Sequence, residues 1–212
     1  MHKNFHIPIP QLDPSESDCA WVMENIAPQL YPALKIIKGA FDRVELPQSE
    51  FINWPQHDAV LAHFDELEIK VRKFAAFIGH PNNATQTAHI DSYIRGVPMV
   101  ARFNIPIQGR RPSSISWWND SITSEKIYER KFVELRHGEE REAYSYGSTI
   151  SDWGNNPIYQ VADPGTCWNR TELAHRPWAG EFNMPRILIT TETANQIPWP
   201  TLVSRLEQLG YC

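Results

Sequence analysis

Cysteine, long apolar runs and excess positive charge are all scarce in this chain of 212 residues, and each shortage excludes a class of protein. Its three cysteines (Cys19, Cys167 and Cys212) are far apart and none belongs to a C-x-x-C pair, so we expect neither a disulfide framework nor a thiolate zinc site. The absence of any apolar run of about 18 residues argues against a membrane partner. The first ten residues also lack the apolar core of a secretion signal, and together these features predict a cytoplasmic protein.

The charge balance is acidic, with a formal net charge of −5. A nucleic-acid-binding surface normally needs a basic patch to neutralise phosphates, so the sequence predicts no nucleic-acid partner. Charged residues are densest between Glu125 and Glu142, where both signs alternate as on a solvated surface. The chain length fits a single domain over residues 1–212.

Helical signals are concentrated in the first third of the chain. A helix is predicted over residues 13–26. Asp13 can cap it, a proline stands at the first helical position, and a glutamate completes a capping box. A second, shorter helix should follow it. In residues 55–67, apolar side chains recur on one helical stripe and predict a third helix. We expect these helices to form a flank over residues 1–68 and a final helix to occupy residues 195–212.

From residue 69 the pattern changes to short alternating segments separated by turn residues, which is typical of strands. The expected strands cover residues 69–72, 87–93, 99–107, 113–118, 126–135, 141–146, 158–161, 166–175 and 186–191. The pair that flanks His137-Gly138 indicates a charged hairpin that could mediate contacts. This spacing is typical of a sandwich or jelly roll. We therefore expect a mainly β core over residues 69–194, interrupted by an insertion at residues 119–156.

An H-x-D motif followed much later by another histidine can supply the two imidazoles and one carboxylate of a non-haem iron site, which leaves positions open for ligands. The chain has two such motifs, His63-Phe64-Asp65 and His89-Ile90-Asp91. Residues i and i+2 share a face on a strand but not on a helix. The first motif lies in a predicted helix and is expected on the surface. His89 and Asp91 lie in a β-like segment and can bind one ion together.

The third ligand should come from a later strand. His175 shares a face with Thr171 and Leu173 in a strand-like stretch, whereas His137 lies at the apparent hairpin tip. In the next strand, Arg186 stands within an apolar segment. A buried guanidinium is costly unless it is paired, and its planar fork matches a carboxylate. We therefore expect Arg186 to anchor an anionic ligand, with a structural salt bridge as the alternative.

These segments resemble the Fe(II)/2-oxoglutarate-dependent oxygenase family. The matching pieces are His89-Ile90-Asp91, residues 99–107 (MVARFNIPI) and the block from Ala174-His175 through Pro185-Arg186-Ile187. The resemblance covers about half the chain and is closest to the branch of aspartyl/asparaginyl and free-amino-acid hydroxylases. It implies a cupin-like double-stranded β-helix, which is a fold of the jelly-roll type.

The resemblance also implies a site and a reaction. His89, Asp91 and His175 would bind iron, Arg186 would hold the distal carboxylate of 2-oxoglutarate, and Arg102 and Asn104 would contact the co-substrate or the substrate. The family consumes O2 and 2-oxoglutarate, releases succinate and CO2, and usually hydroxylates its substrate.

The chain departs from the family pattern at Leu188, where many members have a serine or threonine that also contacts the co-substrate. Tyr93 or Thr171 would have to supply that polar contact. The adjacent Trp117 and Trp118 face opposite ways on a strand, and core packing is favoured over a substrate platform.

Two other functions fit parts of this pattern. A cupin-type iron enzyme that does not use 2-oxoglutarate would leave Arg186 unexplained, and a catalytically silent jelly-roll binding or scaffold protein would need no metal. The substrate of an oxygenase would be a small molecule or a peptide side chain, and two arginines would suit one that bears a carboxylate.

Overall fold

The computed structural model describes residues 2–34, 41–45, 48–79, 89–91, 99–108, 113–118, 128–136, 139–147, 157–178 and 186–212. The helices within these ranges are α1 (Glu16–Asn25), α2 (Ala27–Leu34), α3 (His57–Glu66) and α5 (Trp199–Gln208), with short 3-10 turns at His2–Asn4, Pro10–Leu12 and Gln48–Phe51. None of these helices is long and apolar enough to cross a membrane.

The described strands form a sheet in the order β1-β10-β5-β12-β3-β2-β7-β8-β4-β11-β6-β9. Their bounds are β1 (His6–Pro8), β2 (Phe41–Glu45), β3 (Val71–Gly79), β4 (His89–Ile90), β5 (Ala101–Gln108), β6 (Ser114–Trp117), β7 (Tyr128–Arg136), β8 (Glu139–Gly147), β9 (Tyr159–Ala162), β10 (Cys167–Arg170), β11 (His175–Trp178) and β12 (Arg186–Thr193). Neighbouring strands run antiparallel, apart from β2 and β7, which run parallel. The protein is therefore mainly β, as the sequence predicts.

Local hydrogen bonds explain where α1 begins. The Ser15 hydroxyl accepts the N–H of Asp18 at 3.2 Å, and the Asp18 carboxylate accepts the N–H of Ser15 at 2.8 Å, which completes a capping box. The prediction that Asp13 caps this helix is wrong, because the Asp13 carboxylate instead accepts the N–H of Thr166 at 2.6 Å. The predicted third helix and the final helix are both confirmed, as α3 and α5.

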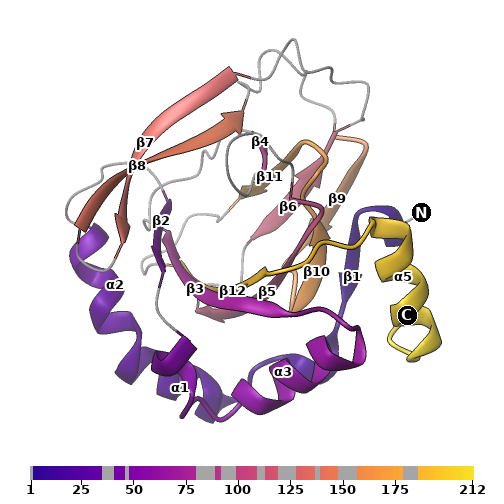
Figure 1. Cartoon of the computed structure of the whole chain (residues 1–212), viewed down its shortest axis with the longest axis horizontal. Helices are drawn as coiled ribbons and strands as arrows, with labels where there is room; N and C mark the ends of the chain where they lie inside the picture. Colours follow the sequence, from indigo (N-terminus) through magenta and orange to yellow (C-terminus); the bar gives the residue numbers. More distant parts are fainter. Residues whose placement is uncertain are drawn as a thin grey trace.

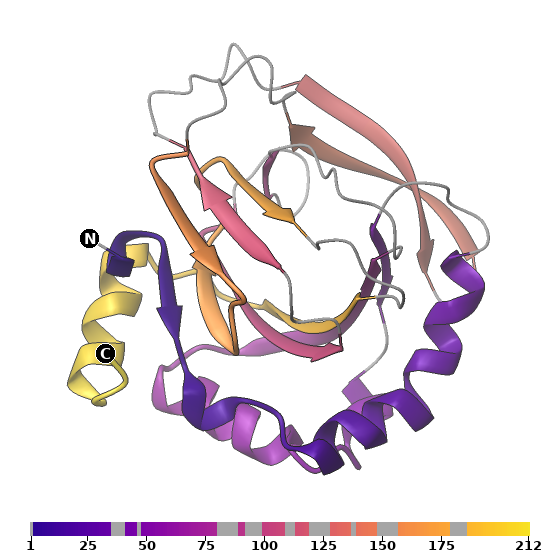
Figure 2. The same ribbon diagram turned by 180° about the vertical axis from the view of Figure 1, so that it is seen from behind.

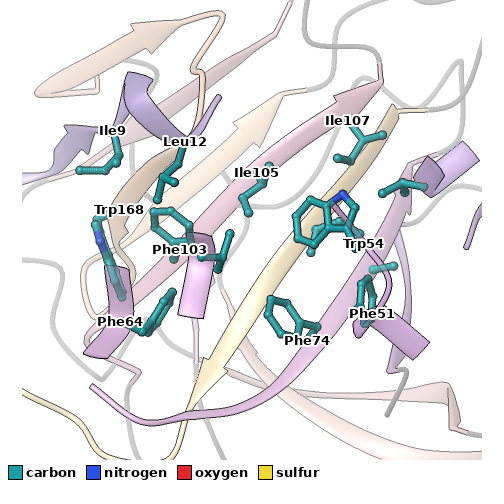
Figure 3. Packing of buried hydrophobic residues seen from close by; sticks show 14 of the residues in the cluster. Ile9, Leu12, Phe51, Trp54, Phe64, Phe74, Phe103, Ile105, Ile107 and Trp168 are labelled. Atoms are coloured by element: carbon teal, nitrogen blue, oxygen red, sulfur yellow. The ribbon is translucent and has the colours of Figure 1, made fainter. Parts of the chain in front are cut away.

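Helices α1, α2 and α3 lie along one side of the sheet that contains β2, β3, β12 and β5 (Figures 1 and 2). The main hydrophobic core fills the space between them. Figure 3 shows Phe103, Ile105 and Ile107 of β5 lying in this core with Phe64 of α3 and Trp168 of β10. Alternate side chains of a strand point to opposite faces. The even-numbered residues of β5 therefore lie on the face turned away from the helices.

The β7–β8 hairpin predicted from charge and turn residues is confirmed, with pairing from Tyr128↔Gly147 to Arg136↔Glu139. It extends along one side of the molecule in both overall views (Figures 1 and 2). At its two edges it pairs with β2 through Glu45↔Arg136 and with β4 through His89↔Gly147. The hairpin thus joins two parts of the sheet.

The strand predicted over residues 166–175 is wrong as a single element. Residues 167–170 form β10, which pairs with β5, whereas His175 begins β11, which pairs with β4 and β6. The chain turns between them because Thr171 is bound to the β5 end, where its N–H donates to the carbonyl oxygen of Val100 at 2.9 Å. This turn carries the chain from one part of the sheet to another, and it brings His175 beside β4.

The expectation that His63 and Asp65 both lie on the surface is wrong for His63. Its side chain is only 2% exposed, and its Nε2 accepts a hydrogen bond from the indole N–H of Trp168 at 3.0 Å. Asp65 is exposed. The two side chains leave α3 in different directions, as their helical spacing predicts, so they do not form a metal site.

Candidate active site

The sheet face opposite the helices carries a group of polar side chains. On β5 these are Arg102 and Asn104, and the register places Asn104 between Cys167 of β10 and Thr190 of β12. Arg102 is paired in the same way with Asn169 of β10. Cross-strand partners share a face, so these residues form one polar surface across three strands. The sequence alone does not decide which face of β5 carries Arg102. Because the helix-covered core lies on the other face, Arg102 belongs to the polar face.

The backbone brings the three expected iron ligands together. His89 of β4 is the direct cross-strand partner of His175 of β11. Asp91 follows β4 immediately, and its N–H donates to the carbonyl oxygen of Thr171 at 3.1 Å. Its own carbonyl oxygen accepts the N–H of Met99 at 2.8 Å, which fixes Asp91 between β5 and the turn before β11.

The side chain of His89 lies outside the described residues, so the triad as a metal site stays a prediction. Among the side chains that are described, no group of three or more histidines, cysteines or carboxylates could hold a metal ion.

The imidazole of His175 is buried, and its Nδ1 lies 3.0 Å from the carbonyl oxygen of Leu173. When Nδ1 carries the proton and donates to this oxygen, Nε2 takes the lone-pair form that a metal ligand needs. A backbone carbonyl two residues earlier therefore orients the ring and sets its tautomer.

Asp91 forms an ion pair with Arg102, in which Nε of Arg102 donates to Oδ2 of the carboxylate. The guanidinium carbon also lies 5.8 Å from the centre of the Phe77 ring, in a cation–π arrangement. Within the described part of the chain, Nη1 of Arg102 is buried and has no hydrogen-bond partner. The Nε edge of the Arg102 guanidinium thus binds Asp91, and Nη1 remains as a second buried hydrogen-bond donor.

Arg186 is the first residue of β12 and lies opposite Gly79 of β3. It is only 5% exposed, and this burial lowers the pKa of its guanidinium to about 10, an effect that the nearby Cys167 partly opposes. The side chain therefore remains a cation at neutral pH. Its Nε is buried without a hydrogen-bond partner among the described residues. A buried cation with an unsatisfied donor favours binding of an anion.

The remaining predicted site residues differ in position. Asn104 is half-buried on the polar face, and Tyr93 lies outside the described residues. The hydroxyl of Thr171 donates to the carbonyl oxygen of Met99 at 2.8 Å, so its hydrogen is used within the fold. Trp117 is fully buried and its indole N–H donates to the carbonyl oxygen of Arg170 at 2.9 Å, which agrees with a packing role.

Two members of the polar face were not among the sequence-based candidates. Cys167 and Asn169 alternate with the core residue Trp168 on β10, and the amide of Asn169 donates to Sγ of Cys167 at 3.2 Å. The segment Cys167–Arg170 (CWNR) shows no alternation of polar and apolar residues, so the sequence carries no clear signal for them.

No family model matches the chain, and no curated protein matches it in sequence. Among solved structures, it is similar to AviO1 from Streptomyces viridochromogenes Tue57, at 13% identity over 92% of this chain and 91% of that chain, with a TM-score of 0.50. Two weaker matches are HygX from Streptomyces hygroscopicus with nickel and 2-oxoglutarate bound (11% identity, 88% and 80% of the two chains, TM-score 0.46) and SnoK, a non-heme alpha-ketoglutarate-dependent carbocyclase from nogalamycin biosynthesis (11%, 88% and 77%, 0.45). At such identities the similarity to AviO1 is a similarity of fold.

Proposed function

We propose that this protein is a non-haem Fe(II)- and 2-oxoglutarate-dependent oxygenase with a double-stranded β-helix core. His89, Asp91 and His175 would hold the iron, and Arg186 would hold the co-substrate. The observation that carries the proposal is the direct pairing of His89 with His175, with Asp91 fixed by backbone hydrogen bonds beside them. Two imidazoles and one carboxylate are the ligand set of this class of site.

The residues present fit a dicarboxylate co-substrate. Arg186 is a buried cation whose Nε has no hydrogen-bond partner among the described residues. A carboxylate would satisfy that donor and neutralise the charge in one contact. In a cupin-type iron enzyme that does not use 2-oxoglutarate, this buried cation would have no carboxylate ligand to bind.

Iron and 2-oxoglutarate, when bound, supply the oxidising chemistry that hydroxylates a carbon–hydrogen bond with release of succinate and CO2. The protein would position the metal ligands and the co-substrate, and it would exclude water from the site. The carbonyl of Leu173 sets the tautomer of His175, and Arg102 holds the carboxylate of Asp91 in a fixed orientation. Arg186 would fix the far end of the co-substrate at a site from which solvent is excluded.

For the primary substrate, we propose a small molecule or a peptide side chain that bears a carboxylate. Arg102 supports this because its Nη1 is a second buried donor without a partner in the described structure. Turnover on a panel of amino acids that is unchanged in an Arg102→Ala variant would contradict this part of the proposal.

The test is a visible spectrum recorded without oxygen after adding Fe(II) and 2-oxoglutarate. We expect a weak metal-to-ligand charge-transfer band in the wild type and no band in His175→Ala or Arg186→Gln. The matched controls are His57→Gln, which replaces a buried histidine of α3, and Arg205→Gln, which replaces an arginine of α5 paired with Glu68. Both controls should keep the band.

Bound iron without a band would favour the cupin-type enzyme. Failure to bind iron would favour a catalytically silent jelly-roll protein and would contradict the proposal.

A further inference from the structure

Strand β11 has two faces, and the candidate iron site uses only one of them. His175 is the cross-strand partner of Trp117 on β6, and Trp117 is in turn the partner of Tyr159 on β9. On this face Trp117 packs with Phe5 in a second, smaller hydrophobic cluster. Because successive residues of a strand point to opposite faces, Arg176 is directed away from His175 and from this cluster.

Arg176 belongs to a row of polar side chains that crosses three strands. Ser116 of β6 is its cross-strand partner, and Gln160 of β9 is the partner of Ser116. Cross-strand partners share a face, so these three residues lie next to one another on the face opposite His175. Ser114 lies two residues before Ser116 on the same face, and its hydroxyl oxygen accepts a hydrogen bond from the Gln160 amide at 3.1 Å.

The guanidinium of Arg176 packs on an aromatic ring and has no carboxylate beside it. Its carbon lies 5.7 Å from the centre of the Trp118 ring, in a cation–π arrangement. Trp118 is only 3% exposed, and its backbone N–H donates to the carbonyl oxygen of Ala174 at 3.0 Å, which fixes the indole beside β11. Among the described residues, no carboxylate forms an ion pair with Arg176, and its Nε is buried without a hydrogen-bond partner.

This arrangement leaves the charge and the hydrogen-bond donors of Arg176 available to a ligand. A guanidinium donates in its own plane, so stacking on an indole orients the group without using its N–H donors. Ser116 is buried, Arg176 is half-buried and Gln160 is exposed, so the row leads from solvent to a sheltered position. Partial shelter from water strengthens a hydrogen bond between a cation and an anion.

We propose that Arg176, Ser116 and Gln160 bind an oxyanion group of a small molecule, either a phosphate or a carboxylate. The guanidinium supplies the charge, and the serine hydroxyl and the amide stand next in the row as neutral donors. The amide of Gln160 keeps one hydrogen after donating to Ser114. The site is independent of the proposed function, because Arg176 and His175 point to opposite faces of β11.

The experiment titrates the whole protein, labelled with ¹⁵N at tryptophan, with sodium phosphate and separately with sodium acetate. Ionic strength is held constant, so that changes in screening do not contribute. The indole resonance of Trp118 is identified by its absence in Trp118→Phe. We expect this resonance to shift and reach saturation. The indole of Trp199, which donates to the carbonyl oxygen of Lys3 at 2.9 Å in another part of the molecule, should not shift.

The variants separate a specific site from general attraction of anions. Arg176→Gln should weaken binding about tenfold or more, as loss of a charged hydrogen-bond donor predicts. The matched control is Arg170→Gln, which replaces a half-buried arginine paired with Glu172 and should leave the affinity unchanged. If Arg176→Gln does not fold, Ser116→Ala is the second variant, and it should weaken binding about threefold to tenfold through loss of one hydrogen bond.

The two anions identify the group that the site prefers. Saturation by phosphate alone would assign the site to a phosphate group, and saturation by acetate as well would extend it to carboxylates. A Trp118 shift that does not saturate with either anion would overturn the proposal. Equal affinity in the wild type and in a folded Arg176→Gln, or in Ser116→Ala, would overturn it too.

Discussion

Replacing His63 with glutamine should make the stability of the protein much less dependent on pH below neutrality. His63 is buried in the helix-side core, and this burial lowers its pKa from 6.5 to about 4. The unfolded chain, in which the imidazole is solvated, therefore takes up a proton at a higher pH than the folded protein does. The contribution is fully present above pH 6.5 and is lost as the pH falls towards 4. The difference in pKa corresponds to about 3 kcal/mol of unfolding free energy, of which roughly 2.5 kcal/mol is lost by pH 4.5.

The assay is urea unfolding of both proteins at about pH 7 and about pH 4.5. Glutamine is chosen because its side-chain oxygen can still accept the indole N–H of Trp168. Titration of carboxylates affects both proteins alike, so the difference between their pH slopes isolates His63. His57→Gln controls for replacing another buried histidine of the same helix. Equal losses of stability in the wild type and in His63→Gln would refute the reasoning.

Two further changes test the site and the core. Arg102→Gln removes the charged partner of Asp91 and should weaken binding of Fe(II) about 10- to 100-fold, as measured by metal titration without oxygen; unchanged affinity would show that the ion pair does not position a ligand. Phe103→Ala leaves a cavity between His63, Phe64 and Trp168, whose rings lie 5.1–5.4 Å from the Phe103 ring, and should lower the unfolding free energy by about 3–5 kcal/mol in urea. A loss below about 1 kcal/mol would mean that the core closes around the gap.

Periodicity was sufficient to predict the elements that lie on one surface of the fold. The stripe of α3 follows from burial on a single side, and the alternation of β5 follows from an apolar face that lies in the core and a polar face that does not. The β7–β8 hairpin was predicted for a related reason, because the turn residues His137 and Gly138 separate two strand-like segments.

The features that the sequence could not reveal depend on distant partners. The break between β10 and β11 contains neither glycine nor proline, and it is fixed by hydrogen bonds from Thr171 to residues of the β5 end. His63 was expected on the surface because its partner, Trp168, lies 105 residues away in the sequence. For the same reason, the pairing of Asp91 with Arg102 could not be derived from the alternation of β5 alone.

The pairing of β1 with β10 has a consequence for how the chain folds. Residue 6 is matched with residue 169, so the first strand has no partner on β10 until residue 169 has been synthesised. Such distant contacts slow folding, because a long loop must be closed before they contribute any free energy. His6, which supports Asn169 beneath the polar face, is therefore placed late. The pairing of β1 with β10 also places Ile7 against Trp168 in the main core, so both faces of this part of the sheet depend on the same distant contact.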